Sequence, residues 1–366
     1  MRINQGTPKT DGFYMPCELA EHRCIYILWP ERPDNWRNGA KPAQKVFKNL
    51  IEVMSKYEPV VVGVNQDQYA HVLGMNLPNV SVVEISNNDS WIRDTGATFL
   101  IDGKGGLRAV DWTFNGYGGL YNGIYFPWDY DDLIAAKMCN IEYADRYRTE
   151  GFVMEGGSIA SDGEGTVIVT EETCLDPGRN PDMTKEQIEG KLKEYLGAEK
   201  VLWIPRGIYG DEDTNGHVDN VVQFVAPGKL LLSWEDNEDD PQYERSQEAL
   251  EYLQSETDAK GRKFEIVKLH VPAPMYITKE ESEGVDSVDG TLPRNEGDRM
   301  AGSYINFGIV NGAILCPQFD NEYDAEAIKV LQECYPDRVI EPIAGAREIL
   351  LGGGNIHCIT QQVPKP

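Results

Sequence analysis

Residues 152–170 read FVMEGGSIASDGEGTVIVT, so that two apolar stretches flank the pair Asp162-Gly163. An Asp-Gly or Asn-Gly pair in this setting is a strong hairpin signal, because glycine accepts the positive φ that a tight turn requires. Three further stretches carry the same pattern around a turn glycine: residues 98–114 with Gly103, residues 221–234 with Gly228, and residues 304–319 with Gly312. The chain therefore contains four predicted β-hairpins.

A helical pattern follows each predicted hairpin, and a short apolar stretch follows most of these helices. The helices are expected at residues 131–141, 184–196, 243–253 and 324–334, and the strands at 200–204, 264–269 and 338–343. An earlier copy supplies a helix at 42–57 and a strand at 59–64. Thr184 and Gln187 have the spacing of a capping box. The repeated unit of hairpin, helix and strand predicts an α/β fold.

The unit occurs about five times if residues 24–29 and 349–363 share the remaining hairpin. Such a chain can close on itself, with its first and last segments paired. An ordinary mixed α/β domain, in which the similarity is accidental, is the alternative. We favour the repeat, because the four turn glycines recur in the same local context.

Composition narrows the classes of function. The 366 residues include 34 Lys and Arg against 60 Asp and Glu, a formal charge of −26, which argues against nucleic acid and anionic membranes as partners. A hydrophobic content of 41% suffices for a sizeable core. The sequence shows neither a membrane-spanning apolar run nor a signal peptide, so we expect a soluble, cytoplasmic protein. Its seven cysteines lack any C-x-x-C pair and fit reduced thiols.

Three acidic residues occupy similar positions relative to the turn glycines. Asp94 lies nine residues before Gly103, Glu155 eight before Gly163, and Asp219 nine before Gly228. We expect these carboxylates to open the first strands of three successive hairpins and to converge at one end of the fold. Buried carboxylates are costly unless they are paired, so three in register favour a site for a cationic ligand over three separate structural pairs.

His217 and Cys358 are the candidate reactive groups. His217 lies two residues before Asp219 and, in a strand, would share its face. The other four histidines have no comparable setting, although His357 adjoins Cys358. Cys358 follows the permissive loop Gly352–Gly354, and by residue type alone it is better interpreted as a buried structural thiol than as a nucleophile. Acids near a thiol disfavour the thiolate, so thiol catalysis here requires a substrate with its own positive charge, such as a guanidinium.

Several segments together resemble those of the agmatine deiminases, members of the guanidine-modifying superfamily. These segments are TPKTDGFYMPCE (7–18), WPERPDNWR (29–37), NNDSWIRDTG (87–96), DWTFNGYGG (111–119), FVMEGGSI (152–159), TNGHVDN (214–220) and GGGNIHCITQQ (352–362). The resemblance runs from about residue 7 to residue 364. It implies a five-fold pseudosymmetric α/β-propeller, a single catalytic domain over residues 1–366, and the hydrolysis of agmatine to N-carbamoylputrescine and ammonia without metal or organic cofactor.

The resemblance also implies a role for each candidate residue. Cys358 would be the nucleophile that forms an amidino-cysteine intermediate, and His217 would transfer protons to ammonia and from water. Asp94 and Asp219 would bind the guanidinium nitrogens, while Glu155 would orient His217 and help hold the substrate. Trp91, three residues before Asp94, lines the pocket or belongs to the core. The residues that receive the far amine of agmatine stay unassigned, and a homo-oligomer remains open.

Three other functions compete with this one. A deiminase of free or peptidyl arginine belongs to the same superfamily, and a non-catalytic polyamine-binding protein would keep the acidic pocket without needing Cys358. A metal enzyme is disfavoured, because His217 and Asp219 lack a helical H-E-x-x-H partner and the cysteines do not have zinc spacing.

Overall fold

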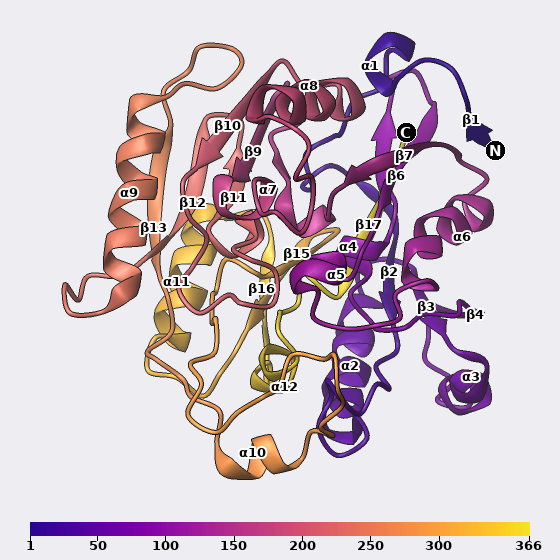
Figure 1. Cartoon of the computed structure of the whole chain (residues 1–366), viewed down its shortest axis with the longest axis vertical. Coiled ribbons are helices and arrows are strands. Elements are labelled where there is room, and N and C mark those ends of the chain that lie inside the picture. The colour runs from indigo at the N-terminus through magenta and orange to yellow at the C-terminus, as the bar shows by residue number, and fades with distance from the viewer.

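The computed structural model describes all 366 residues, and its strands form five separate small sheets (Figure 1). Every sheet contains one antiparallel pair of strands and a further strand that runs parallel to the second member of that pair. A parallel neighbour requires a crossover connection, and a helix supplies it in each sheet. The predicted α/β class is confirmed, and the same hairpin, helix and strand unit recurs in all five sheets.

The strands of the five sheets have the following bounds. They are β5 (Thr98–Ile101), β6 (Leu107–Thr113), β7 (Asp145–Val153) and β1 (Arg2–Ile3) in the first; β8 (Ala160–Ser161), β9 (Thr166–Thr170) and β10 (Lys200–Ile204) in the second; β11 (Val222–Ala226), β12 (Lys229–Trp234) and β13 (Glu265–His270) in the third; β14 (Gly308–Val310), β15 (Ala313–Pro317) and β16 (Val339–Ile343) in the fourth; and β17 (Thr360–Pro364), β2 (His22–Leu28), β3 (Val60–Val64) and β4 (Val80–Glu84) in the fifth.

Helices connect the parallel strands, and Figure 1 shows several of them toward the outside of the molecule. The crossover helices are α6 (Ile134–Ile141), α8 (Lys185–Leu196), α9 (Pro241–Ser255), α11 (Asp324–Cys334), α2 (Lys41–Met54) and α3 (Gln66–Leu73). The shorter helical segments are α1 (Pro8–Asp11), α4 (Ile92–Thr95), α5 (Gly119–Asn122), η1 (Asp131–Leu133), η2 (Gly156–Ser158), α7 (Glu171–Cys174), η3 (Val218–Asn220), α10 (Lys279–Glu283) and α12 (Arg347–Leu351). The predicted capping box of Thr184 and Gln187 starts α8.

The four predicted hairpins are confirmed, and so is the shared fifth one. Gly103, Gly163, Gly228 and Gly312 have φ values of 66°, 74°, 80° and 80°, as their tight turns require. The fifth hairpin joins the two ends of the chain, because β17 pairs antiparallel with β2. The first and last segments of the chain thus lie in one sheet. The arrangement of the five sheets around a common axis stays a prediction.

The apolar core consists of five clusters, and each contains the buried face of one crossover helix. In the largest cluster, Phe47 and Leu50 of α2 pack with Ile25 of β2 and Val62 of β3. The other clusters gather around α11, α8, α6 and α9 in the same way. Burial of these faces fixes each helix on its own sheet and leaves the loops before the hairpins to form the site.

The structure also bears on membrane association. None of its helices combines the length and the apolar character that crossing a bilayer demands.

Candidate functional site

Three short helical turns carry the predicted acidic residues. Asp94 lies in α4, Glu155 is the residue immediately before η2, and Asp219 lies in η3. Each turn stands directly before the first strand of a hairpin, α4 contacts η2, and η2 contacts η3. Figure 1 shows α4 near the middle of the view. The structure therefore confirms the prediction that the three carboxylates come together.

The expectation that these acids, and His217, belong to the strands themselves is wrong. The backbone N–H groups of Asp94, Ser158 and Asn220 donate to the carbonyls of Trp91, Glu155 and His217, which is the pattern of a helical turn. The strand ladders start only a few residues later, where a neighbouring strand supplies partners. In the residues before each ladder, hydrogen bonds within the helical turn pair the backbone N–H and C=O groups.

Gly157 lies at the centre of the site. Its N–H donates to Asp94 Oδ1 at 2.8 Å. A Cβ atom added at Gly157 would lie 2.6 Å from His217 Nδ1 and 2.9 Å from both Asp219 Oδ2 and Asp94 Oδ1. These three side chains therefore face one small space, and only a glycine at position 157 leaves that space open.

His217 is fully buried between carboxylates. Its Nδ1 lies 3.7 Å from Asp94 Oδ1 and its Nε2 lies 3.8 Å from Glu155 Oε2, and neither ring nitrogen has a hydrogen-bond partner. Burial alone would lower the pKa of His217, but the surrounding carboxylates, Asp94 foremost, raise it to about 9. The ring is therefore an imidazolium at neutral pH and carries a proton that it can give away.

Glu155 is held by a residue that the sequence gave no reason to select. Arg179 Nε donates to Glu155 Oε1 at 3.2 Å, while Glu155 Oε2 has no hydrogen-bond partner. Burial would raise the pKa of Glu155, but Arg179 and His217 outweigh it and lower the pKa below its usual value. Arg179 lies in a loop after α7, and nothing local marks it as different from any other loop arginine.

Cys358 lies beside Asp219, directly before β17. Its Sγ is 3.5 Å from Asp219 Oδ2 and 3.1 Å from Asn306 Nδ2, which donates to it. Burial, together with the charges of Asp219 and Asp94, raises the pKa of the Cys358 thiol well above its usual value. The raised pKa favours the neutral thiol over the thiolate.

His357 lies between two carboxylates, so the prediction that its surroundings are not comparable with those of His217 is wrong. Its Nδ1 lies 2.8 Å from Asp219 Oδ2, and its Nε2 lies 2.9 Å from Glu18 Oε2. Arg93 Nη1 is 3.6 Å from the other oxygen of Glu18. Burial would raise the pKa of Glu18, but His357 and Arg93 lower it to about 2. The sequence does not indicate this contact, because Glu18 is 339 residues from His357 along the chain.

A pocket opens onto Cys358 and Asp94. It is lined by Trp91, Asp94, Tyr117, Ile124, Asp213, Thr214, Gly352, Gly353 and Cys358. The hydroxyl of Tyr117 donates to Asp94 Oδ2 at 2.8 Å. Both alternatives for Trp91 hold at once, since it lines this pocket and also stacks on Trp36 in the core, with ring centroids 5.1 Å apart.

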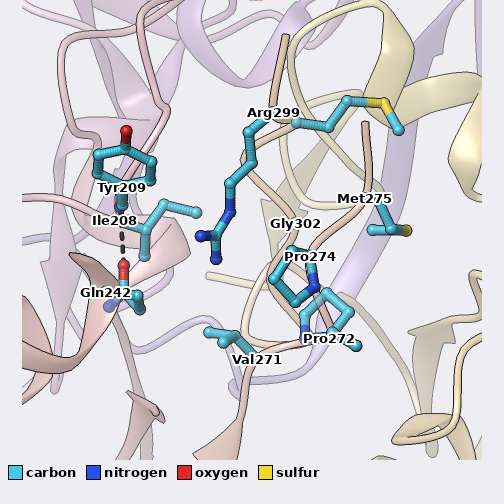
Figure 2. Close-up of a pocket in the computed structure, with 11 residues that line it drawn as sticks. Ile208, Tyr209, Gln242, Val271, Pro272, Pro274, Met275, Arg299 and Gly302 are labelled. Atoms are coloured by element: carbon cyan, nitrogen blue, oxygen red, sulfur yellow. Dashed lines mark hydrogen bonds between the residues drawn. The ribbon is translucent and has the colours of Figure 1, made fainter. Parts of the chain in front are cut away.

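A second hollow lies apart from these residues (Figure 2). Figure 2 shows the Arg299 guanidinium between Tyr209 and Pro274. Arg299 Nη1 donates to both oxygens of Asp240, at 3.0 and 2.8 Å, so its charge is balanced. None of the predicted site residues lines this hollow.

Comparison with known proteins shows which family this chain matches. The model of the Porphyromonas-type peptidyl-arginine deiminase family matches residues 14–364. The agmatine deiminase of Pseudomonas aeruginosa is 52% identical over 98% of each chain. The structure of an Enterococcus faecalis agmatine deiminase catalysing its reaction is 47% identical, covers 100% of this chain and 99% of its own, and has a TM-score of 0.97. A cysteine-to-serine variant of the C. jejuni agmatine deiminase, with substrate bound, is 26% identical over 96% of each chain, with a TM-score of 0.82.

Proposed function

Because this chain belongs to the Porphyromonas-type peptidyl-arginine deiminase family and to its agmatine deiminases, we propose that it hydrolyses agmatine to N-carbamoylputrescine and ammonia. The reaction breaks a C–N bond of the guanidinium group, and Cys358 serves as the nucleophile. The relatives that carry the name of this activity match the whole chain, which supports agmatine as the substrate.

One observation carries the proposal: the cluster of charged side chains that includes the Asp219 neighbour of Cys358 holds several buried polar atoms without hydrogen-bond partners. Glu155 Oε2, Asp219 Oδ1 and both ring nitrogens of His217 are buried without a hydrogen-bond partner. Buried polar groups without partners are costly, so a ligand that supplies donors would stabilise this arrangement. A guanidinium is a planar cation whose N–H groups match carboxylate oxygens in pairs. Asp94 and Asp219 would bind its nitrogens, and Glu155 would help to hold it.

The chemistry proceeds in two halves. In the first, the Cys358 thiol loses its proton to solvent as the cationic substrate binds, and the thiolate Sγ attacks the central guanidinium carbon to form an S–C bond. A C–N bond then breaks, and ammonia leaves with a proton that His217 donates. In the second half, His217 takes a proton from water, which adds to the amidino carbon, and the S–C bond breaks to release the ureido product and the thiol. Glu155 orients His217 throughout. Such proton transfer is typically worth about 10²- to 10⁴-fold in rate.

The positive charge of the substrate offsets the repulsion between the carboxylates of the site and the thiolate of Cys358. Burial raises the pKa of Cys358, and the negative charges of Asp219 and Asp94 raise it further. A guanidinium placed between these two carboxylates cancels their effect on the sulfur and adds attraction for the thiolate. The nucleophile therefore forms when its substrate binds, and a cationic substrate is needed for turnover.

We further propose that the five units surround one pseudo-five-fold axis in a single domain that spans the chain. Five segments, each directly before the first strand of a hairpin, contribute to the site: those of Asp94, Glu155, Asp219, Asn306 and Cys358. A common axis would explain why equivalent positions meet. Cytoplasmic location, the lack of nucleic-acid partners and independence of any cofactor or metal stay predictions.

Rapid-quench mass spectrometry of protein mixed with agmatine tests the proposal. We expect a substrate-derived adduct on Cys358, together with ammonia and ureido product in steady state. Cys358→Ala should abolish turnover and keep agmatine binding, whereas Cys334→Ala, a change of a remote cysteine on α11, should keep both. An adduct on another cysteine would exclude the assigned nucleophile. Faster turnover of arginine or peptidyl arginine would exclude agmatine as the preferred substrate, and unchanged function in Cys358→Ala would favour a polyamine-binding protein.

A further inference from the structure

Tyr117, which lines the pocket beside Asp94, has a strained backbone. Its φ is 65°, in the left-handed region, where bulky residues are rarely found. Gly116, Gly118 and Gly119 have positive φ values too, of 67°, 147° and 58°. Glycine adopts such values freely, so the cost falls on the tyrosine alone. Strain of this kind persists only where the surrounding contacts impose it, and it is concentrated at functional sites.

The contacts of the buried Tyr117 side chain aim its hydroxyl at one acceptor. The ring packs edge-on against Phe114, with centroids 5.1 Å apart, and its centroid lies 6.3 Å from that of Tyr125 and 6.1 Å from that of His217. The hydroxyl donates to Asp94 Oδ2 at 2.8 Å. Burial, together with the charge of Asp94, raises the pKa of Tyr117 well above its usual value. The hydroxyl therefore keeps its proton and remains a donor to this carboxylate.

Two donors from different segments hold the Asp94 carboxylate. The N–H of Gly157, in η2, donates to Oδ1, and the hydroxyl of Tyr117 donates to Oδ2, both at 2.8 Å. The carboxylate cannot turn about its Cβ–Cγ bond without losing both hydrogen bonds. Without the Tyr117 hydroxyl, Oδ2 would be a buried carboxylate oxygen with no partner, which is costly for the ionised form.

The charges around Asp94 leave its ionised form dependent on these donors. The titratable groups that surround it are His217 and Asp219 from η3, Glu155 before η2, and Tyr117, Asp213 and Cys358 of the pocket lining. Burial raises the pKa of Asp94 to about 6, and the charges of Asp219 and Glu155 act in the same direction, against His217. Loss of one hydrogen-bond donor would therefore let Asp94 take up a proton near neutral pH.

We propose that Tyr117 is a positioning residue that keeps the Asp94 carboxylate charged and turned toward the guanidinium site. This proposal rests on the proposed function, because it concerns a carboxylate that is assigned there to the substrate nitrogens. The strained turn at residues 116–119 brings the hydroxyl to Oδ2 while Gly157 holds Oδ1. Each oxygen of a carboxylate has about two lone-pair sites, so both can still accept from a guanidinium.

The pH dependence of agmatine turnover in Tyr117→Phe tests the proposal, because this change keeps the ring and removes only the hydroxyl. A lost hydrogen bond to a charged group corresponds to about 10- to 100-fold in an equilibrium, so Asp94 should take up its proton about 1 to 2 pH units higher. We expect kcat/KM to be about 10- to 100-fold below that of the unmodified protein near pH 5.5, and to approach it near pH 9.

Tyr121→Phe is the matched control, because it removes the same hydroxyl from an exposed tyrosine of the neighbouring α5. Its pH profile should coincide with that of the unmodified protein. A loss in Tyr117→Phe of the same size at every pH would mean that Tyr117 is only a wall of the pocket. An unchanged profile would mean that Asp94 does not depend on the hydroxyl, and either result would overturn the proposal.

Calorimetric titration of agmatine into Cys358→Ala, with and without Tyr117→Phe, separates this proposal from the proposed function. The dependence of the heat on the ionisation enthalpy of the buffer reports the protons released on binding. At pH 7, we expect about 0.1 proton from Asp94 in Cys358→Ala and about 0.5 to 0.9 when Tyr117→Phe is added. Equal proton release in both proteins would exclude the role of Tyr117 alone, whereas absence of agmatine binding would exclude the proposed function.

Discussion

Substitution of Gly157 by alanine is expected to abolish most activity while the fold survives. The added methyl carbon would lie 2.6 Å from His217 Nδ1 and 2.9 Å from Asp94 Oδ1 and Asp219 Oδ2. Gly157 is not among the residues with positive φ, so alanine introduces no backbone strain there. The effect should therefore fall on the site, in the space assigned to the guanidinium, and not on the chain conformation.

The size of the effect follows from these distances. An ordinary Cβ contact begins at 3.4 Å, so the three side chains must retreat by about 0.5 to 0.8 Å in different directions. A displacement of about 1 Å of reacting groups typically costs about 100-fold in rate, and the methyl group also occupies substrate space. We therefore expect kcat/KM for agmatine to fall by about 100-fold or more.

Ammonia release measures the activity, and circular dichroism with urea unfolding monitors the fold. Gly190→Ala is the matched control, because Gly190 lies exposed in α8 and nothing stands within 4 Å of an added Cβ. This change should keep full activity and stabilise the protein by about 0.5 to 1 kcal/mol, because alanine is the better helix residue. Full activity in a folded Gly157→Ala protein would refute the placement of the substrate at this centre.

Three further predictions concern the charges of the site. Because Asp94 must be ionised, with a pKa of about 6, and the Cys358 thiol must lose its proton, kcat/KM should fall steeply as pH falls through about 6, while loss of the His217 proton, with a pKa of about 9, should end the rise of kcat/KM with pH above about 9; a profile flat from pH 5 to 10 would contradict these roles. His357→Ala should lower kcat by about 10-fold or more by releasing Asp219, with His357→Asn less impaired; equal activity of both variants and the unmodified protein would remove His357 from the site. Arg179→Met should leave Glu155 buried without its partner and reduce the free energy of unfolding by about 3 to 5 kcal/mol in urea titrations, and unchanged stability would contradict this.

Local patterns sufficed to predict the repeated unit. The hairpins, crossover helices and parallel strands are each specified by adjacent residues, such as the turn glycines and the capping box at Thr184. The pairing of β17 with β2 could also be predicted, because four hairpins were complete and the first and last segments of the chain each supplied one strand of a fifth. The placement of the five sheets relative to one another could not be predicted from local patterns, because sheets that share no strand are positioned only by side-chain packing between them.

The candidate site divides in the same way. Asp94, Glu155 and Asp219 stand out because each acid interrupts an apolar context at a similar distance from a turn. The sequence did not show that these acids lie on helical turns. The alternation of apolar and polar residues does not reveal at which residue a strand begins to pair with its neighbour. Asn306 precedes the fourth hairpin as the acids precede theirs, so its position was a usable signal. Glu18 and Arg179 gave none, because their partners are brought to them by tertiary structure alone.

The balance of charges around Cys358 supports the proposal that its thiolate forms only when a cationic substrate binds. Four buried acids and four buried bases are linked in contacts between 2.8 and 3.8 Å: Glu18, Asp94, Glu155 and Asp219 with Arg93, Arg179, His217 and His357. With both imidazoles protonated, this network is neutral, and a lone thiolate would add an uncompensated negative charge in a buried place. A guanidinium adds one positive charge, and a thiolate then restores neutrality. In the proposed reaction only these few of the 60 acidic residues act directly, because buried charges are screened by solvent much less than exposed ones.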